Sequence, residues 1–307
     1  MPRPLLLMLA LVLALGVNRP VPAAGQSLDD TPRTVVMSAS SHEWKTLLAA
    51  TAGRTDHLLD GKLFVTGRLA GRDVLLVLSG VSMVNAAMTT QKAIDRFNVK
   101  AVVFSGIAGG VDPSLDIGDV IVPDQWGQYL ESVFAREVDG RFVPLRANRA
   151  KNRYPNFGMM FPRATEVTRT GLDSPELRFW FPADARLLEV ARRIAGRVVL
   201  DRCTPEGRCL TLTPKVVVGG NGVSGQSFVD NAAFRTYTRD TFRAVVLDME
   251  SAAVAHVAFS QGVPFIAFRS LSDLAGGGAG ENQMGTFFAL AAENSARVVR
   301  TFLAEMP

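Results

Sequence analysis

Apolar runs of strand length alternate with amphipathic helical segments through most of the chain, and this alternation predicts an α/β domain. The clearest unit has an apolar strand at 244–247, a helix over 251–260 and a second strand at 264–268. Gln261 and Gly262 are expected to end the helix. Such a βαβ unit normally has parallel strands, whose carboxyl ends meet at one edge of the sheet.

Similar elements are predicted on both sides of this unit. Strands are expected at 34–38, 63–68, 73–79, 101–105, 119–122 and 215–219, and helices at 41–50, 82–97, 183–193, 231–241 and 284–303. The strands 63–68 and 73–79 are close enough to form a hairpin. The pattern loosens at about 125–213. We therefore expect one α/β domain over 33–305 with a mixed β-sheet and an irregular insertion at about 125–213.

The first residues follow a different pattern. Arg3 precedes an apolar run at 5–15, and small residues follow at 21–25. This order is typical of a secretory signal peptide, which we place at residues 1–25. A permanent membrane anchor is the alternative, but the apolar run is short for a span and polar residues at 18–20 interrupt it. We expect a periplasmic or secreted protein with no membrane anchor after cleavage.

The composition further restricts the class of protein and its partners. With 307 residues, 48% of them hydrophobic, the chain can fill one large core. Its net charge of +4 is spread along the sequence, which does not favour a nucleic-acid partner. In an exported protein, Cys203 and Cys209 are expected to form a disulfide across a short turn. The three histidines show no ligand spacing, so we expect no metal.

Two carboxylates follow the strands of the βαβ unit. Glu250 comes after the first strand and Asp273 after the second, so both can face one cleft. Their alternative roles are stabilisation of a helix N-terminus and of a turn. The glycine segment 105–110 also follows a strand, where glycines let a backbone approach a ligand. It lacks the spacing of a dinucleotide-binding fingerprint, and a tight turn is its other interpretation.

Five motifs occur together and in one order: SGIAGG, DPSLDIGDVIVPD, GQSFVD, LDMESAAVAHVA and FRSLSD. In these motifs the chain resembles the family of nucleoside phosphorylases and methylthioadenosine/S-adenosylhomocysteine nucleosidases. The resemblance covers about 35–122 and 220–302, and the ending resembles the secreted and storage-protein branch of the family. It implies a single-domain three-layer sandwich, with a central mixed β-sheet between helices. It also implies a homo-oligomer and no cofactor.

The resemblance also implies roles for individual residues. Asp273 matches the general acid that protonates the leaving purine, and Glu43 matches the carboxylate that orients the attacking water. Arg269 matches an arginine on the same side of the site. Such groups can stabilise the transition state, because breaking a ribosyl bond places positive charge on the sugar and negative charge on the base.

The expected substrate contacts come from four segments. Glu250 matches the residue that holds the ribose hydroxyls, Met249 matches the side chain that packs against the sugar, and Phe228 and the backbone of Val229 match the purine-binding positions. The remaining expected contacts are Ile107, Ala108, Gly109 and Ser272. Many nucleosidases carry a serine where this chain has Ile107, and that serine helps to hold the water.

Three functions remain open at this point. The first is cleavage of purine nucleosides or thionucleosides by water, in extracytoplasmic salvage. The second is phosphorolysis, with phosphate as a further partner. Hydrolysis is favoured because a phosphate site needs cationic or backbone donors, and only Arg269 stands at a matched position. The third is a non-catalytic binding or storage protein, against which the presence of both Glu250 and Asp273 argues.

Overall fold

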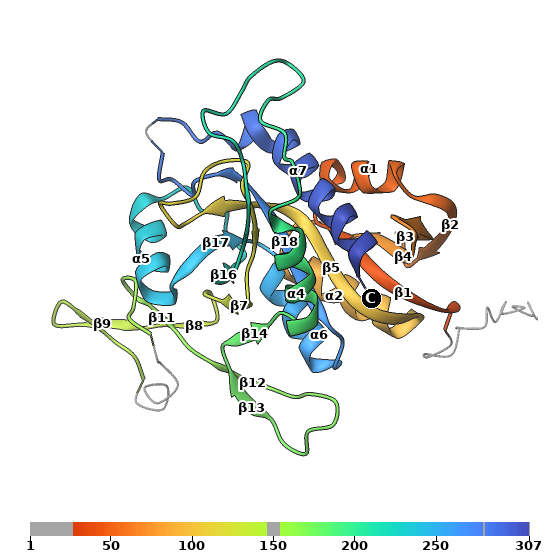
Figure 1. Ribbon diagram of the computed structural model, residues 1–307. Helices are drawn as coiled ribbons and strands as arrows, with labels where there is room; N and C mark the ends of the chain where they lie inside the picture. The colour runs from red at the N-terminus through yellow and green to blue at the C-terminus, as the bar shows by residue number, and fades with distance from the viewer. Residues whose placement is uncertain (1–26, 146–153, 279, 307) are drawn as a thin grey trace, which may run out of the picture.

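The computed structural model describes residues 27–145, 154–278 and 280–306, which form a central β-sheet with helices on both faces (Figure 1). The predicted signal peptide at residues 1–25 lies outside these ranges. Among the helices in the described ranges, none is long and apolar enough to cross a membrane.

The central sheet has 12 strands in the described part of the chain, of mixed direction. Its main path runs in the order β14 (Trp180–Pro182), β7 (Gln125–Gln128), β16 (Asn221–Ser224), β17 (Ala244–Asp248), β5 (Phe97–Gly110), β1 (Asp29–Ser38), β4 (Arg72–Leu78), β3 (Lys62–Leu69) and β2 (Ala52–Leu59). Beside β5, the sheet continues through β18 (Phe265–Asp273), β6 (Val120–Val122) and β15 (Val216–Val218). β3 and β4 are antiparallel neighbours, so the predicted hairpin is confirmed.

Helices pack on the two faces of this sheet and enclose two apolar cores. One core lies under α1 (Ser41–Ala49), α4 (Ala185–Ala195) and α7 (Met284–Glu305), and the other under α2 (Met83–Arg96) and α6 (Ser251–Ser260). Successive side chains of β5 alternate between the cores: Val103 enters the first, while Val102 and Phe104 enter the second. The expected three-layer α/β sandwich is therefore confirmed.

Side-chain caps account for several helix starts. Ser40 accepts from the backbone N–H of Glu43 at the start of α1, and Asp184 accepts from two backbone N–H groups at the start of α4. Asn231 caps α5 (Ala232–Phe242), which packs beside β16 and β17. These polar residues fix where the helices begin, and the helices agree with their predicted positions to within two residues.

The long strand β5 differs from expectation in two ways. The glycine segment 105–110 is not a turn but the continuation of β5. In addition, β18 runs parallel to β5, whereas β17 runs antiparallel to its last residues, so the expectation of parallel strands in the βαβ unit is wrong. The reason is that β5 extends beyond β1, and β17 pairs with this free extension. Leu247 and Asp273 consequently pair with Gly109 from opposite sides.

The segment 125–213 contributes to the sheet as well as to its periphery. β7 and β14 from this segment form one end of the main sheet path. Three small antiparallel pairs lie outside that sheet (Figure 1). They are β8 (Ser132–Phe134) with β11 (Met160–Pro162), β9 (Arg136–Val138) with β10 (Arg141–Val143), and β12 (Thr165–Val167) with β13 (Glu176–Arg178). Sequence patterning predicted only the helix α4 here.

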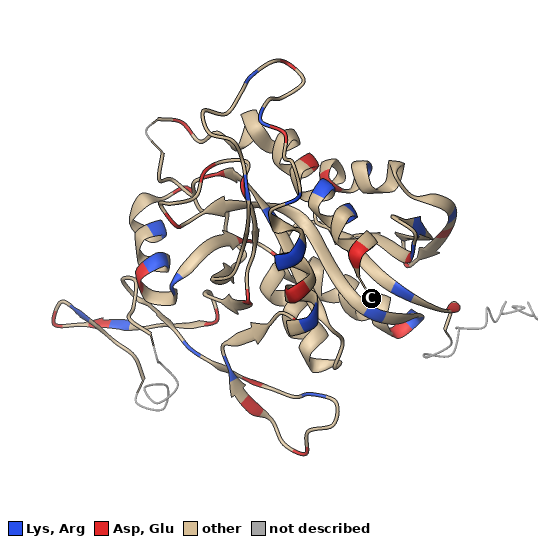
Figure 2. Cartoon of the chain, in the orientation of Figure 1, with Lys and Arg blue, Asp and Glu red and all other residues tan. Residues whose placement is uncertain are grey.

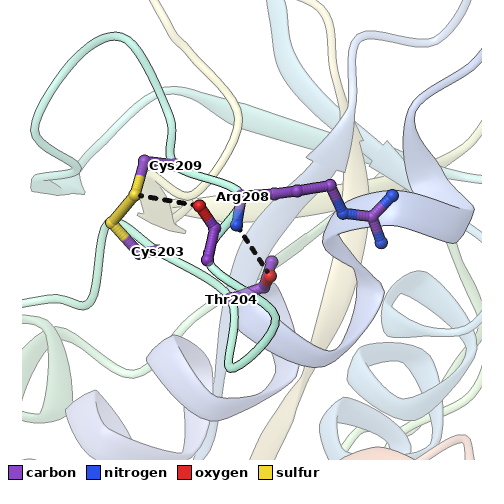
Figure 3. Close-up of a disulfide and its surroundings, with 5 residues drawn as sticks. Cys203, Thr204, Arg208 and Cys209 are labelled. Carbon is purple, nitrogen blue, oxygen red and sulfur yellow. Dashed lines mark hydrogen bonds between the residues drawn. A yellow bond between two sulfur atoms is a disulfide. The ribbon is translucent and has the colours of Figure 1, made fainter.

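The predicted disulfide is confirmed: Cys203 and Cys209 are bonded across a tight loop (Figure 3). Their Cα atoms lie 4.0 Å apart, and the backbone N–H of Leu210 donates to the Arg202 carbonyl on the other side of the loop.

Elsewhere on the molecule, basic and acidic positions alternate over helices and loops without forming one basic face in this view (Figure 2).

Candidate active site

A cavity of about 270 Å³ lies where β5, β17 and β18 end near the start of α1. Apart from Arg269, all of the site residues predicted from the sequence line it. Its lining consists of Ala39, Ser40, Glu43, Val81, Ile107, Ala108, Gly109, Ser227, Phe228, Val229, Leu247, Asp248, Met249, Glu250, Ser272, Asp273, Met284 and Phe288. The sequence thus predicted which segments meet, and four carboxylates are among the residues that they bring together.

Glu43 is buried at one end of this cavity, in the first turn of α1. Its Oε2 accepts from the backbone N–H groups of Ala39 and Ser40, at 2.9 and 2.7 Å. Its Oε1 accepts from the backbone N–H of Ile107 at 3.0 Å. Three backbone donors therefore hold the carboxylate in one orientation.

Gly106 lets Glu43 and Arg269 approach the same point of β5. A Cβ atom on Gly106 would lie 2.2 Å from Nη1 of Arg269 and 2.9 Å from Oε1 of Glu43. Both distances are too short for nonbonded atoms. The glycine is needed here for space and not for an unusual backbone conformation, because its backbone is part of an ordinary strand.

Glu250 lies between the cavity and Arg269. Its Oε1 accepts from the backbone N–H of Ser82 at 2.9 Å, and its Oε2 lies 3.5 Å from Nη2 of Arg269. Burial raises the pKa of Glu250 to about 7, and Arg269 opposes this rise while Asp248 and Glu43 add to it. Glu250 makes no capping hydrogen bond to α6, which leaves its carboxylate available to a ligand.

Asp248, rather than Glu250, stabilises the start of α6. Its Oδ1 accepts from the backbone N–H groups of Glu250 and Ser251, at 3.2 and 3.1 Å, and from the Ser224 hydroxyl at 2.5 Å. Its Oδ2 lies 2.8 Å from Nε of Arg269. The alternative role of a helix-stabilising carboxylate, which the sequence left open for this segment, therefore applies to Asp248.

Arg269 is fully buried behind the cavity wall, with 0% of its surface exposed. Its Nε lies 2.9 Å from the Ser251 hydroxyl, and its guanidinium carbon stacks 4.0 Å from the centroid of the Phe104 ring. Since it does not line the cavity, we assign Arg269 to positioning Glu250 and Asp248 rather than to direct contact with a ligand.

Asp273 closes another side of the cavity and is 3% exposed. Its Oδ2 accepts from the Ser272 hydroxyl at 2.9 Å, and its Oδ1 accepts from the backbone N–H of Ala275 at 2.8 Å. Burial raises the pKa of Asp273, although these hydrogen bonds oppose the rise. The carboxyl group is thereby moved toward the protonated form that an acid catalyst needs.

Apolar side chains form the rest of the wall. Phe228 is 52% exposed at the rim, while Val229 is buried. Met284 and Phe288 come from α7 and were not predicted as site residues. The helical period of the C-terminal segment shows that α7 has a buried face, but not that its first turns reach this cavity.

Asn282 is a further residue that the sequence did not predict in the site. Its amide nitrogen lies 3.5 Å from Oδ1 of Asp273 and 3.0 Å from Oδ1 of Asp230. Its own carbonyl oxygen accepts from the backbone N–H of Met284 at 2.8 Å. Asn282 thus connects the buried acid to an exposed carboxylate. Its position in a glycine-rich loop gave no periodic signal.

Comparison with known proteins adds independent information. The family model described as the phosphorylase superfamily matches residues 33–304. The 5'-methylthioadenosine/S-adenosylhomocysteine nucleosidase of Marinomonas sp. (strain MWYL1) is 30% identical over 241 residues, which is 78% of this chain and 84% of that protein. Bark storage protein A of Populus deltoides is 30% identical over 224 residues, 70% of each chain.

A solved structure shows the same relationship in three dimensions. The 5'-methylthioadenosine/S-adenosylhomocysteine nucleosidase of Neisseria meningitidis, in complex with methylthio-immucillin-A, has a TM-score of 0.65 and 27% identity. The match covers 89% of this chain and 98% of that chain. The similarity therefore extends over nearly the whole of the solved protein.

Proposed function

This chain belongs to the phosphorylase superfamily, and from the carboxylates around its cavity we propose that it hydrolyses the N-glycosidic bond of purine nucleosides or thionucleosides. The observation that carries this proposal is the charge of the cavity. Glu43, Asp248, Glu250 and Asp273 line it, whereas its described lining includes no lysine or arginine. Such a wall suits a developing sugar cation and a water nucleophile better than it suits a phosphate anion.

The proposed reaction uses three of these carboxylates. Asp273 donates its proton to the purine as the bond between sugar and base breaks, so the electron pair leaves on a neutral base. Glu250 accepts hydrogen bonds from the sugar hydroxyls and stabilises positive charge on the ring. Glu43 holds the attacking water through a carboxylate that three backbone donors keep in place. The water oxygen then bonds to the sugar and releases one proton to solvent on the Glu43 side.

Two alternatives remain distinct in their chemistry. Phosphorolysis requires an anion site, and the one arginine of the matched motifs is already paired with Asp248 and Glu250. A storage function is supported by the similarity to bark storage protein A. A storage function gives no reason for two buried carboxyl groups with raised pKa values, Glu250 and Asp273, in one cavity.

One experiment separates these functions. Purified protein is incubated with adenosine, inosine or methylthioadenosine, with and without phosphate, and the free base is measured. Release without phosphate supports hydrolysis, and release that depends on phosphate supports phosphorolysis. If no base is released from any of the three, both enzymatic functions are wrong and the storage function is favoured.

We also propose that the protein acts outside the cytoplasm. The N-terminal sequence pattern and the disulfide Cys203–Cys209 support this location, because disulfides persist in oxidising compartments. Cell fractionation, together with mass spectrometry of the mature N-terminus, tests it. Cleavage near residue 25 and recovery outside the cytoplasm are expected.

A homo-oligomer is the assembly we propose. Val81, at the rim of the cavity, and Val84 and Met88 of α2 are 49%, 54% and 64% exposed, and apolar side chains clustered in this way are typical of interfaces. Light scattering on purified protein measures the assembly directly. A monomeric mass at micromolar concentration would contradict the proposal.

A further inference from the structure

A second, smaller cavity lies against Asp273, and the inference drawn from it rests on the proposed function. This cavity measures about 60 Å³. It is lined by Ile117, Asp230, Asp273, Leu274, Gly276, Gly278, Gly280, Glu281, Asn282 and Gln283. Asp273 also lines the larger cavity, so its carboxyl group stands between the two.

The two oxygens of Asp273 have partners on different sides. Oδ2 accepts from Ser272, which lines the larger cavity. Oδ1 accepts from Ala275 and lies 3.5 Å from the amide nitrogen of Asn282, which lines the smaller one. A carboxyl group held in this way can take up a proton on one oxygen and give one up from the other without rotating.

The smaller cavity leads from Asp273 toward solvent. Asn282 bonds to Asp230 at 3.0 Å, and Asp230 is exposed, as is Glu281 beside it. The cavity exceeds the roughly 10–15 Å³ that one water molecule needs, and its polar side chains offer the partners that a buried water requires. A hydrogen-bonded water chain from Asp230 to Asp273 therefore fits this space.

We propose that the smaller cavity is a water-filled proton inlet, through which Asp273 is reprotonated after it has given its proton to the leaving base. In each turnover one proton passes from Asp273 to the base. The attacking water loses one proton to solvent on the Glu43 side, and Asp273 regains one through the inlet. Asn282 is thus a positioning residue, and Asp230 is the acceptor at the outer end.

The charged groups around the inlet are few. Asp230 and Glu281 face it from the segments before α5 and α7. Arg235 of α5 lies nearby, but its Nε donates to the carbonyl of Gly110 at 3.0 Å. Asp230 raises the pKa of Asp273, and the Asn282 amide opposes that rise. Changes at Asp230 or Asn282 should therefore alter the pH profile of turnover rather than substrate binding.

The test compares Asn282→Leu with Asn282→Asp. The leucine removes the polar partners of the water, whereas the aspartate keeps the carbonyl-type contact to Met284 and can itself pass a proton. For Asn282→Leu we expect kcat at pH 8 to fall about tenfold with KM nearly unchanged, and to rise again when imidazolium is added at constant pH and ionic strength. Asn282→Asp should keep a kcat that does not depend on imidazolium.

Asp230→Asn should lower kcat at high pH in the same way, while the matched Asp240→Asn, an exposed carboxylate on α5, should have no effect. The inlet is wrong if Asn282→Leu keeps the wild-type pH profile. It is equally wrong if kcat and KM change together and imidazolium restores nothing, because that pattern indicates a structural role.

A second measurement is independent of turnover. A high-resolution crystal structure of the full mature protein should contain ordered water within hydrogen-bond distance of Oδ1 of Asp273 and connected to Asp230. A dry cavity would overturn the inlet even if the protein is an active nucleosidase. If the wild type releases no base, the proposed function fails, and the ordered water still decides whether the cavity is hydrated as proposed.

Discussion

Glu43 in α1 accepts a hydrogen bond from the backbone N–H of Ile107 in β5, at 3.0 Å. This contact joins the helix that carries the proposed water-holding carboxylate to the glycine segment. Because the donor is a backbone group, it does not depend on the side chain at this position. The isoleucine found where many nucleosidases have a serine therefore leaves the orientation of Glu43 unchanged.

Glu43→Gln should reduce kcat by about 10²–10⁴-fold, with a smaller effect on KM. The amide lacks the negative charge that orients the water, and its NH2 group cannot accept from the backbone donors around it. We expect a loss of stability of about 1–3 kcal/mol as well. Steady-state kinetics and urea unfolding measure the two effects. Glu189→Gln on the exposed side of α4 is the matched control, and equal effects in both variants would remove the role assigned to Glu43.

Asp273→Asn should abolish base release while the protein stays folded. Asparagine preserves the volume, its oxygen can still accept from Ala275, and its nitrogen can donate to Ser272, but it has no proton to give to the base. Activity assays and thermal melting test this expectation. Wild-type activity in Asp273→Asn would show that another group is the acid.

Gly106→Ala should impair both stability and turnover. The new methyl group would collide with the guanidinium of Arg269 and with the carboxylate of Glu43. Both side chains are held in place by other contacts. We expect destabilisation of about 1–3 kcal/mol, the usual cost of overpacking. Gly285→Ala serves as control, because a Cβ there meets open space in α7. If the two variants are equally stable, the close approach at Gly106 is not as tight as described.

Stability should decrease as the pH rises from about 5 to about 7. Burial raises the pKa of Glu250 from 4.5 to about 7, so in this range the folded protein binds a proton that the unfolded chain has lost. The contribution is present at pH 4.5 and below and is lost as the pH approaches 7. Glu250→Gln should flatten this decrease, which is on the order of 1–3 kcal/mol. Urea unfolding across this range measures it, and an unchanged slope in the variant would argue against a raised pKa.

Local patterns predicted the elements well, because strand and helix periods depend on residues close in sequence. The helix 251–260 and the hairpin before α2 are examples. The path of β5 could not be predicted in the same way. Its last residues are glycines, which resemble a turn in sequence, and only the pairing of β17 and β18 on either side keeps them extended. β2 and β16 were missed because their residues are not markedly apolar.

In the candidate site, too, the sequence predicted some features and not others. The family resemblance predicted residues that line the cavity, including Glu43, which is distant in sequence from Asp273. How these residues are held was not predicted: Arg269 was expected in the site but lies behind its wall, Asp248 pairs with it, and Asn282 reaches Asp273 from a glycine-rich loop. Such contacts depend on how separate elements pack, and no spacing along the chain encodes them.

The proposed hydrolysis is tested by the identity of the sugar product when phosphate is abundant. Purified protein is incubated with the nucleoside it cleaves fastest, in excess phosphate, and the products are followed by ³¹P NMR together with an assay for reducing sugar. Hydrolysis predicts free sugar equal in amount to the released base, with no sugar phosphate. Sugar 1-phosphate in place of free sugar would show that the reaction is phosphorolysis and not hydrolysis.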